Sequence, residues 1–96
     1  MPKKIDANQR TVVKTFRQLG WSFAITSDVG RGFPDGVGGY RGRNYLIEIK
    51  DGAKPLSAQK LTPDQVVFHE AWRGQVIIIR SVQDVIDLTN RLNKEQ

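Results

Sequence analysis

The sequence GFPDG at residues 32–36 and the sequence YLIEIK at residues 45–50 form the pattern that decides the fold of this chain. The second segment alternates in polarity as a β-strand does, so we expect Glu48 and Lys50 on one face and Ile49 on the core side. Gly and Arg dominate the residues between the two segments, and residues 41–44 (RGRN) predict a hairpin loop. A short strand near residues 35–38 would then pair with the strand at 45–50, which brings Asp35, Glu48 and Lys50 together.

These three charged side chains make the candidate catalytic site. Ionised groups on an otherwise apolar strand cost free energy unless something pairs with them. A divalent cation held by Asp35 and Glu48, with the ammonium of Lys50 beside it, would offset that cost. Such a set suits phosphodiester hydrolysis, because the cation polarises a phosphoryl oxygen and acidifies a water while the lysine orients the water or steadies developing charge. The residues therefore predict a nuclease.

Each of these residues also has an ordinary structural interpretation. Asp35 lies between Pro34 and Gly36, in a sequence that forms turns by itself. Glu48 and Lys50 would also suit the solvated face of an edge strand. The order of the three favours catalysis, because an aspartate that opens a hairpin faces the return strand that carries the Glu-x-Lys pair.

The remaining elements follow from periodicity and capping residues. The chain predicts one domain over residues 1–96, with elements in the order α-β-β-β-α-β-α. Before the hairpin we expect a helix from the Asp6 cap to Gly20 and a strand at 21–26. After it we expect a mobile loop at 51–61, a helix at 62–72 with Thr62 as N-cap, and a strand at 76–79 that is covered on both faces. The last element is a helix capped by Ser81, and its expected buried residues are Val82, Val85, Ile86 and Leu92.

Composition sets wider limits. The apolar share of 39% is ordinary for a globular chain. No apolar run approaches the ~20 residues that cross a membrane, and the N-terminal residues lack a secretory apolar region. The chain has no cysteine, which excludes disulfides and thiolate metal sites and favours a reducing cytoplasm. The net charge of +5 suits a phosphate-binding surface.

The ordered set of motifs resembles the small VRR-NUC domains of the PD-(D/E)XK nuclease superfamily, which resemble Holliday-junction resolvases and often stand alone in phage genomes. The resemblance spans roughly residues 6–88. The matching segments are residues 8–10 (NQR), 19–20 (LG), 32–35 (GFPD), 48–52 (EIKDG), 61–65 (LTPDQ), 72–76 (WRGQV) and 80–82 (RSV).

The resemblance implies an α/β fold, namely a restriction-endonuclease-like αβββαβ core around a mixed four-stranded sheet flanked by helices, with the C-terminal helix added. It implies Mg²⁺ or Mn²⁺ as cofactor, consistent with oxygen-only ligands, and no organic cofactor. The backbone carbonyl of Ile49, next to Glu48, is the expected third ligand beside the two carboxylates.

Two glutamines are candidates for supporting roles. Thr62 and Gln65 have the spacing of a capping box, which alone would explain Gln65. In VRR-NUC domains a glutamine at this place lies beside the catalytic strand and helps to position water or phosphate, so we weigh both roles equally for Gln65. Related resolvases place a glutamate in the first helix that contacts the metal through water. The candidate positions here hold Asn8 and Gln9, neutral amides that can hydrogen-bond a metal-bound water but supply no charge.

The expected DNA contacts are basic residues near the site in the predicted topology, namely Arg31, Arg41, Arg43, Lys54 and Lys60. His69 is the only histidine and we interpret it as a structural or surface residue, because no serine or cysteine nucleophile accompanies it.

Three functions from different classes fit this pattern to different degrees. The favoured function is a metal-dependent endonuclease that cuts structured DNA such as four-way junctions or flaps, acting as a homodimer in the cytoplasm, in the bacterial host cell if phage-encoded. The alternative is an inactive nucleic-acid-binding module, against which the intact Asp35, Glu48 and Lys50 argue. A structural protein with incidental carboxylates fits the ordered motifs least.

Overall fold

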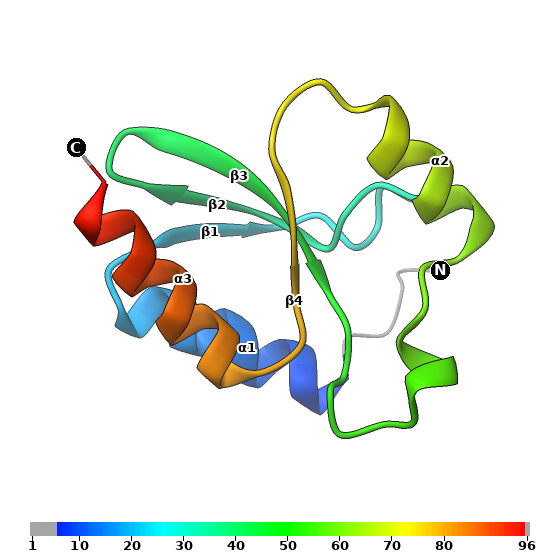
Figure 1. Cartoon of the computed structure of the whole chain (residues 1–96), viewed down its shortest axis with the longest axis horizontal. Coiled ribbons are helices and arrows are strands. Elements are labelled where there is room, and N and C mark those ends of the chain that lie inside the picture. The colour runs from blue at the N-terminus through cyan, green and yellow to red at the C-terminus, as the bar shows by residue number, and fades with distance from the viewer. Residues whose placement is uncertain (1–5, 96) are drawn as a thin grey trace.

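A computed structural model describes residues 6–95. It contains one mixed sheet of four strands that lie in chain order across the sheet: β1 (Ser22–Ile25), β2 (Gly36–Tyr40), β3 (Arg43–Ile49) and β4 (Val76–Ile79) (Figure 1). Strand β2 is antiparallel to both β1 and β3, and β4 is parallel to β3. The predicted mixed four-stranded sheet is confirmed.

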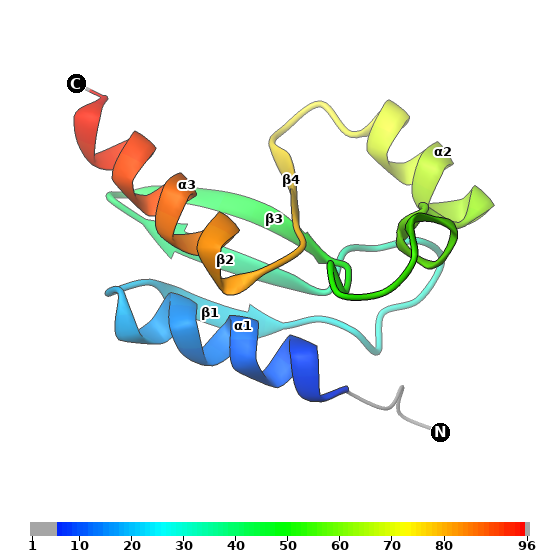
Figure 2. The ribbon, with the colours of Figure 1, turned by 60° about the horizontal axis from the view of Figure 1, so that its bottom comes forward.

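Three α-helices flank the sheet: α1 (Ala7–Gln18), α2 (Pro63–Ala71) and α3 (Val82–Lys94). Helices α1 and α3 lie side by side and pack against β1 and β4 respectively, whereas α2 stands apart from them, at the end of the sheet where β3 finishes (Figures 1 and 2). The order α-β-β-β-α-β-α and the C-terminal helix are as predicted. None of the helices in the described part of the chain has the length and apolarity to span a membrane.

The main core lies between the sheet and the helix pair α1 and α3. Alternate residues of β3 face it, with Tyr45 and Ile47 fully or nearly buried and Ile49 packed at its border. Leu46, Glu48 and Lys50 therefore belong to the other face of the sheet. The remaining members of the core are Val12, Val13, Phe16, Trp21, Phe23, Ile79, Val85, Leu88 and Leu92.

Side-chain caps fix the helix starts at the positions that the sequence predicts. Asp6 accepts a hydrogen bond from the Gln9 amide at the start of α1, and Ser81 accepts one from the Asp84 amide at the start of α3. Helix α3 buries Val85 and Leu92 as predicted. It also buries Leu88 and Thr89, while Val82 and Ile86, which we expected inside, are only half-buried.

The β2–β3 hairpin is longer and tighter than predicted. Its turn consists of Arg41 and Gly42 alone, both with positive φ (52° and 79°), as in the two-residue turns that match the twist of paired strands. The strands therefore include Tyr40 and Arg43. The predicted loop at 51–61 contains a short 3₁₀ helix, η1 (Leu56–Gln59), and the buried Gln59 side chain donates to the Gly52 and Lys54 carbonyls.

The prediction that β4 is covered on both faces is wrong. Only Ile79 is buried, and Val76, Ile77 and Ile78 are half-buried. The reason is that β4 is an edge strand with one neighbour, β3. Ile79 pairs in register with Ile49 and shares its core side, whereas Ile78 pairs with Glu48 and faces the α2 side.

A matched pair of conservative substitutions in β4 tests this assignment. Ile79→Val is expected to lower the free energy of unfolding by about 1 kcal/mol, because it removes a methylene from a closed core. Ile78→Val is expected to lower it by less than about 0.5 kcal/mol, since its surroundings are open to water. Urea unfolding measures both, and equal effects would contradict the assignment of the two faces.

Candidate active site

Sheet register places Asp35 and Glu48 across from each other. The last pair of the β2–β3 ladder is Gly36 with Ile47, so one further step in the same register opposes Asp35 and Glu48. Directly opposed residues of an antiparallel pair point to the same face, with Cβ atoms about 5 Å apart. The two carboxylates therefore share the α2 face of the sheet, as the sequence predicts.

A hydrogen bond holds the Asp35 carboxylate against β3. The Ile49 amide donates to Asp35 Oδ2 at 2.7 Å. The Leu46 and Lys50 amides point to the opposite edge of β3, where they donate to the carbonyls of Gln75 and of Ile79 in β4. Because a strand residue directs its N–H and C=O to the same side, the Ile49 carbonyl also faces the side of Asp35.

The polypeptide around Asp35 is held by residues that follow β1. The Thr26 amide donates to the Asp35 carbonyl at 2.8 Å, and its hydroxyl donates to the Pro34 carbonyl at 2.8 Å. The Asp35 residue is 6% exposed and Glu48 is 1% exposed. Buried carboxylates on one face of a sheet need partners that offset their loss of hydration.

Gln65 supplies one set of partners: it forms the predicted capping box and also lies beside the strand that carries Glu48, while its part in positioning water or phosphate stays a prediction. Its side-chain oxygen accepts from the Thr62 amide at 2.9 Å while the Thr62 hydroxyl accepts from the Gln65 amide, which completes the capping box of α2. The same oxygen accepts from Lys50 Nζ at 2.8 Å. Its amide nitrogen donates to Glu48 Oε2 at 3.3 Å. Gln65 therefore links α2 to both charged residues of the strand.

His69 is a member of the site that our interpretation of the sequence missed. Its Nε2 lies 3.4 Å from Glu48 Oε1, and its side chain is 14% exposed. Burial and, second, the charge of Lys50 lower the pKa of His69, so the neutral ring is favoured near pH 7. The available signal was helical spacing, because His69 follows Gln65 by four residues and shares its face of α2.

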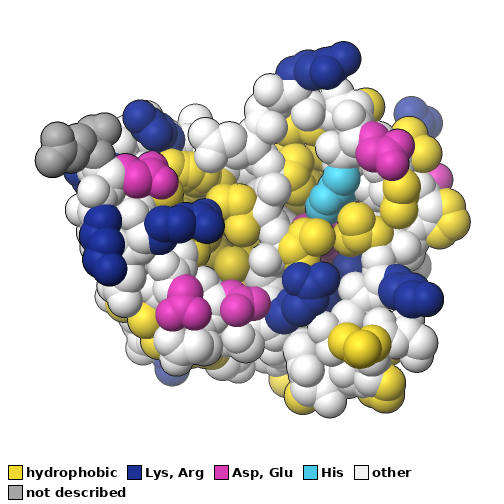
Figure 3. All heavy atoms as spheres, in the orientation of Figure 1, with side chains coloured by type: hydrophobic (Ala, Val, Ile, Leu, Met, Phe, Trp, Pro, Cys, Tyr) yellow, Lys and Arg dark blue, Asp and Glu magenta, His cyan; other side chains and the backbone are white. Residues whose placement is uncertain are grey.

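Helix α2 is held over this end of the sheet by the loop before β2. A Cβ on Gly32, where φ is +79°, would lie 2.3 Å from the Asp64 carbonyl oxygen, so only glycine allows the loop this close. The rings of Phe33 and Phe68 meet edge to face at 5.3 Å. Figure 3 shows the one histidine, in cyan, at the surface of the hollow between α2 and the sheet, among apolar side chains.

The first turn of α1 also borders the site. Asn8 Nδ2 donates to the Lys50 carbonyl at 3.2 Å. Gln9 is buried, and its side-chain nitrogen donates to the Ser27 hydroxyl at 2.8 Å. Ser27 directly follows Thr26, which holds the Asp35 backbone. Gln9 thus lies next to the loop that carries a carboxylate.

The expectation that Arg41 and Arg43 lie near the site is wrong. They stand at the hairpin turn, and Glu48 lies toward the opposite end of the seven-residue strand β3, about 17 Å along the chain. Arg41 instead donates to the Leu92 carbonyl at the end of α3, and Arg43 lies 4.0 Å from the Glu95 carboxylate. The tight turn carries both residues to the far end of the sheet.

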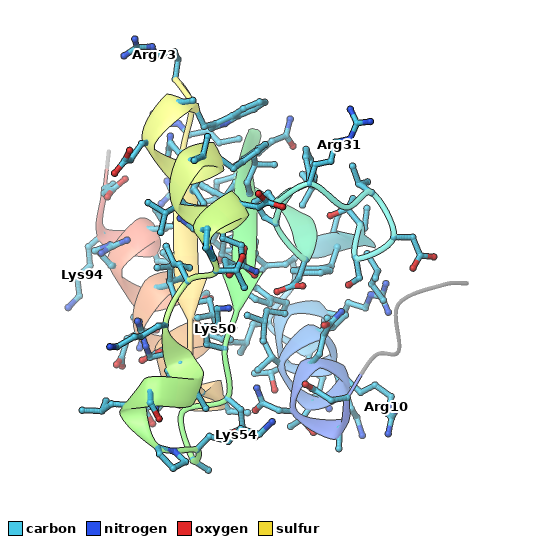
Figure 4. The ribbon with its side chains drawn as sticks, turned by 90° about the vertical axis from the view of Figure 1, so that its right-hand side faces the viewer. Arg10, Arg31, Lys50, Lys54, Arg73 and Lys94 are labelled. Atoms are coloured by element: carbon cyan, nitrogen blue, oxygen red, sulfur yellow. The ribbon has the colours of Figure 1, made fainter. Side chains whose placement is uncertain are left out.

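The other three predicted DNA contacts lie at the end of the molecule that holds the site. Arg31, Lys54 and Lys60 are all exposed. Arg31 precedes the glycine that packs on α2, and in Figure 4 its side chain projects away from the fold. Lys54 lies in the loop after Lys50, and Lys60 lies just before the cap of α2.

The donor chemistry of the site fits a hard divalent cation. Within residues 6–95 no group of three or more His, Cys, Asp or Glu side chains is arranged to hold a metal. The site offers two carboxylates, from Asp35 and Glu48, and faces the Ile49 carbonyl toward Asp35. Mg²⁺ is bound in proteins by one or two carboxylates and keeps several waters, so these oxygens fit Mg²⁺ or Mn²⁺.

Comparison of the chain with protein-family models, with curated proteins and with solved structures gives no match. Any inference about function therefore rests on the residues and geometry of the site.

The two roles of Gln65 are separable by substitution. Thr62→Ala and Gln65→Ala each break the capping box, so each is expected to lower the free energy of unfolding by about 1 kcal/mol. Only Gln65→Ala also removes the acceptor of Lys50. The ammonium should then be more mobile, which the ¹⁵N signal of Lys50 Nζ in NMR spectra would report. A Lys50 signal that changes equally in both variants would contradict the separate role of Gln65.

Proposed function

We propose that this protein is a divalent-metal-dependent nuclease that hydrolyses DNA phosphodiester bonds. The observation that carries the proposal is the sheet register that opposes Asp35 and Glu48, with Lys50 two residues beyond Glu48 on the same face. Two buried carboxylates and a lysine have no evident structural need in this position. They match the requirements of phosphoryl transfer to water.

Each residue has a distinct task in this proposal. The carboxylates of Asp35 and Glu48, with the Ile49 carbonyl, would hold Mg²⁺ or Mn²⁺. The cation, when bound, polarises a phosphoryl oxygen and makes a water more acidic. Lys50 donates to Gln65, 2.8 Å away, and Gln65 also contacts Glu48, so the ammonium is held on the face of the carboxylates, where it would stabilise negative charge that develops on the phosphate.

Glu48 contacts Gln65 at 3.3 Å and His69 at 3.4 Å, both longer than usual for hydrogen bonds to a carboxylate. Contacts of this length would leave its oxygens able to hold a cation. The hollow beside His69 in Figure 3 is the route by which phosphate reaches Glu48 in this proposal.

Structured DNA, such as a four-way junction or flap, is the proposed substrate, and it rests on the resemblance to junction resolvases. The alternative function is an inactive module that binds nucleic acid with the same fold. Cleavage of labelled junction, flap, duplex and single-stranded DNA, compared side by side, separates these cases. No cleavage of any of the four with Mg²⁺ or Mn²⁺ would favour the inactive module.

Lys50→Ala is expected to lower the cleavage rate by about a hundredfold or more, because it removes charge stabilisation at the phosphate. Lys94→Ala is the control, since Lys94 is exposed on α3, on the opposite side of the molecule in Figure 4. Rates on the best of the four DNA substrates, with Mg²⁺ saturating, measure the effect. Wild-type turnover by Lys50→Ala would show that Lys50 is only a surface charge.

Removal of either carboxylate should weaken the cation site and spare the fold. Glu48→Gln and Asp35→Asn are each expected to lower Mn²⁺ affinity at least tenfold in calorimetry. Without metal, Glu48→Gln should unfold at an equal or higher temperature than the wild type, because the substitution removes a buried charge. Asp87→Asn, on the exposed side of α3, is the control. Wild-type Mn²⁺ affinity in both site variants would refute the ligand assignment. Ca²⁺ should bind without supporting cleavage.

A homodimer is the proposed functional unit on junctions. A four-way junction is cut on two strands at symmetry-related places, and a two-fold dimer supplies two sites at a fixed separation. Light scattering at micromolar concentration, in low and moderate salt, is expected to give twice the chain mass of 10.9 kDa. A strictly monomeric protein that still makes paired cuts would show that the dimer is not needed.

A further inference from the structure

The outward side of α1 carries positive charges without any negative ones. Arg10, Lys14 and Arg17 follow one another at intervals of four and three residues, so they lie on one side of the helix. All three are exposed, and residues 7–18 contain no Asp or Glu. We call these three residues the α1 stripe. The opposite side of the same helix enters the core.

The α1 stripe borders a groove at the open edge of the sheet. The groove is lined by Arg10, Val13, Lys14, Arg17, Gln18 and Ile25. Strand β1 is an edge strand, and Ile25 at its end is 44% exposed. The Arg17 guanidinium donates to the Phe23 carbonyl at 2.9 Å, which places a positive charge over this edge. The groove therefore has an apolar floor and cationic walls.

The α1 stripe starts next to the candidate active site. Gln9, the neighbour of Arg10, is bonded to Ser27, and Ser27 follows the residue that holds the Asp35 backbone. Asn8 contacts the Lys50 carbonyl at 3.2 Å. Figure 4 shows Arg10 at the start of α1, on the same side of the molecule as Lys50 and Lys54. From Arg10 the helix leads the stripe away from the two carboxylates.

We propose that the α1 stripe binds the sugar-phosphate backbone of the DNA strand that runs away from the active site, an inference that rests on the proposed function. The helix advances about 10 Å from Arg10 to Arg17, which corresponds to about three phosphates of one DNA strand. The deoxyribose rings carry no charge, so they face the apolar floor of the groove. The carboxylates closest in sequence are Asp6, which caps α1, and Asp28 in the loop after β1.

Continuity with the site favours DNA over other polyanions. An acidic peptide or an anionic membrane would also meet positive charge on α1, but neither explains why the stripe begins in the first turn of α1, where Asn8 contacts the Lys50 carbonyl. A DNA strand that leaves the carboxylates would pass around this end of the sheet to reach Arg10. Arg41 and Arg43 stand at the far end of the sheet and do not contact DNA at this site. The α1 stripe supplies contacts with the DNA backbone in their place.

The test is DNA binding in EDTA, where cleavage cannot occur, with fluorescent duplex and single-stranded 20-mers at several salt concentrations. Lys14→Gln is expected to weaken binding about tenfold near 0.1 M salt and to lower the slope of log K against log salt by about one. The double variant Arg10→Gln/Lys14→Gln should lose about a hundredfold. The control pair Arg91→Gln/Lys94→Gln removes the same charge from exposed positions of α3 and should change affinity less than threefold.

Unchanged DNA affinity in the α1 variants, or an equal loss in the α3 control pair, would overturn the proposal. So would a loss of binding to phosphatidylserine vesicles without a loss of DNA binding. Thermal unfolding confirms that each variant is folded. Stripe-dependent binding in a protein that cuts no DNA with Mg²⁺ or Mn²⁺ would refute the proposed nuclease and leave the α1 stripe intact. DNA cleavage by a protein whose DNA binding does not depend on the α1 stripe would support the proposed nuclease and refute the proposed role of the stripe.

Discussion

The hydrogen bond from the Ile49 amide to Asp35 is the interaction on which the candidate site depends. At 2.7 Å it fixes the carboxylate at the point where the β2–β3 ladder ends. Without it, Asp35 would be one more turn residue before a strand. With it, Asp35 faces Glu48, and the Ile49 carbonyl is directed to the same side. This one hydrogen bond thus brings together, at the end of the hairpin, oxygen atoms that can act as metal ligands.

Burial makes this cluster unfavourable unless other groups compensate. Glu48 is 1% exposed, yet its carboxylate lies across from a second carboxylate. Helix α2 supplies the compensation through Gln65 and His69, and Gln65 also orients Lys50. The helix that covers the site therefore also organises its charges. Residues that a fold buries at such expense, with a lysine kept beside them, are characteristic of functional sites rather than of packing.

Local signals in the sequence predicted most of the fold. The caps at Asp6, Thr62 and Ser81 and the alternation around Glu48 depend only on neighbouring residues, and all appear in the structure. The half-buried state of β4 could not be predicted, because it depends on which strand lies at the sheet edge. That order is set by pairing between distant segments.

The candidate site was predicted only in part, because it depends both on local signals and on how distant segments pack together. Asp35, Glu48, Lys50 and Gln65 lie together because one hairpin and one helix cap specify them. His69 was missed although its spacing from Gln65 was visible, since nothing in the sequence alone aims α2 at Glu48. Arg41 and Arg43 were misplaced because a two-residue turn adds strand length and moves them away from the carboxylates.

Cation binding by Asp35 and Glu48 together is what we propose first for this site. Crystals soaked in MnCl₂ and measured at the manganese absorption edge test it most directly, because the anomalous signal locates the ion without assumptions about activity. We expect one strong peak between the two carboxylates, within bonding distance of an oxygen of each. A site elsewhere, or no peak beside Asp35 and Glu48 at millimolar Mn²⁺, would contradict it.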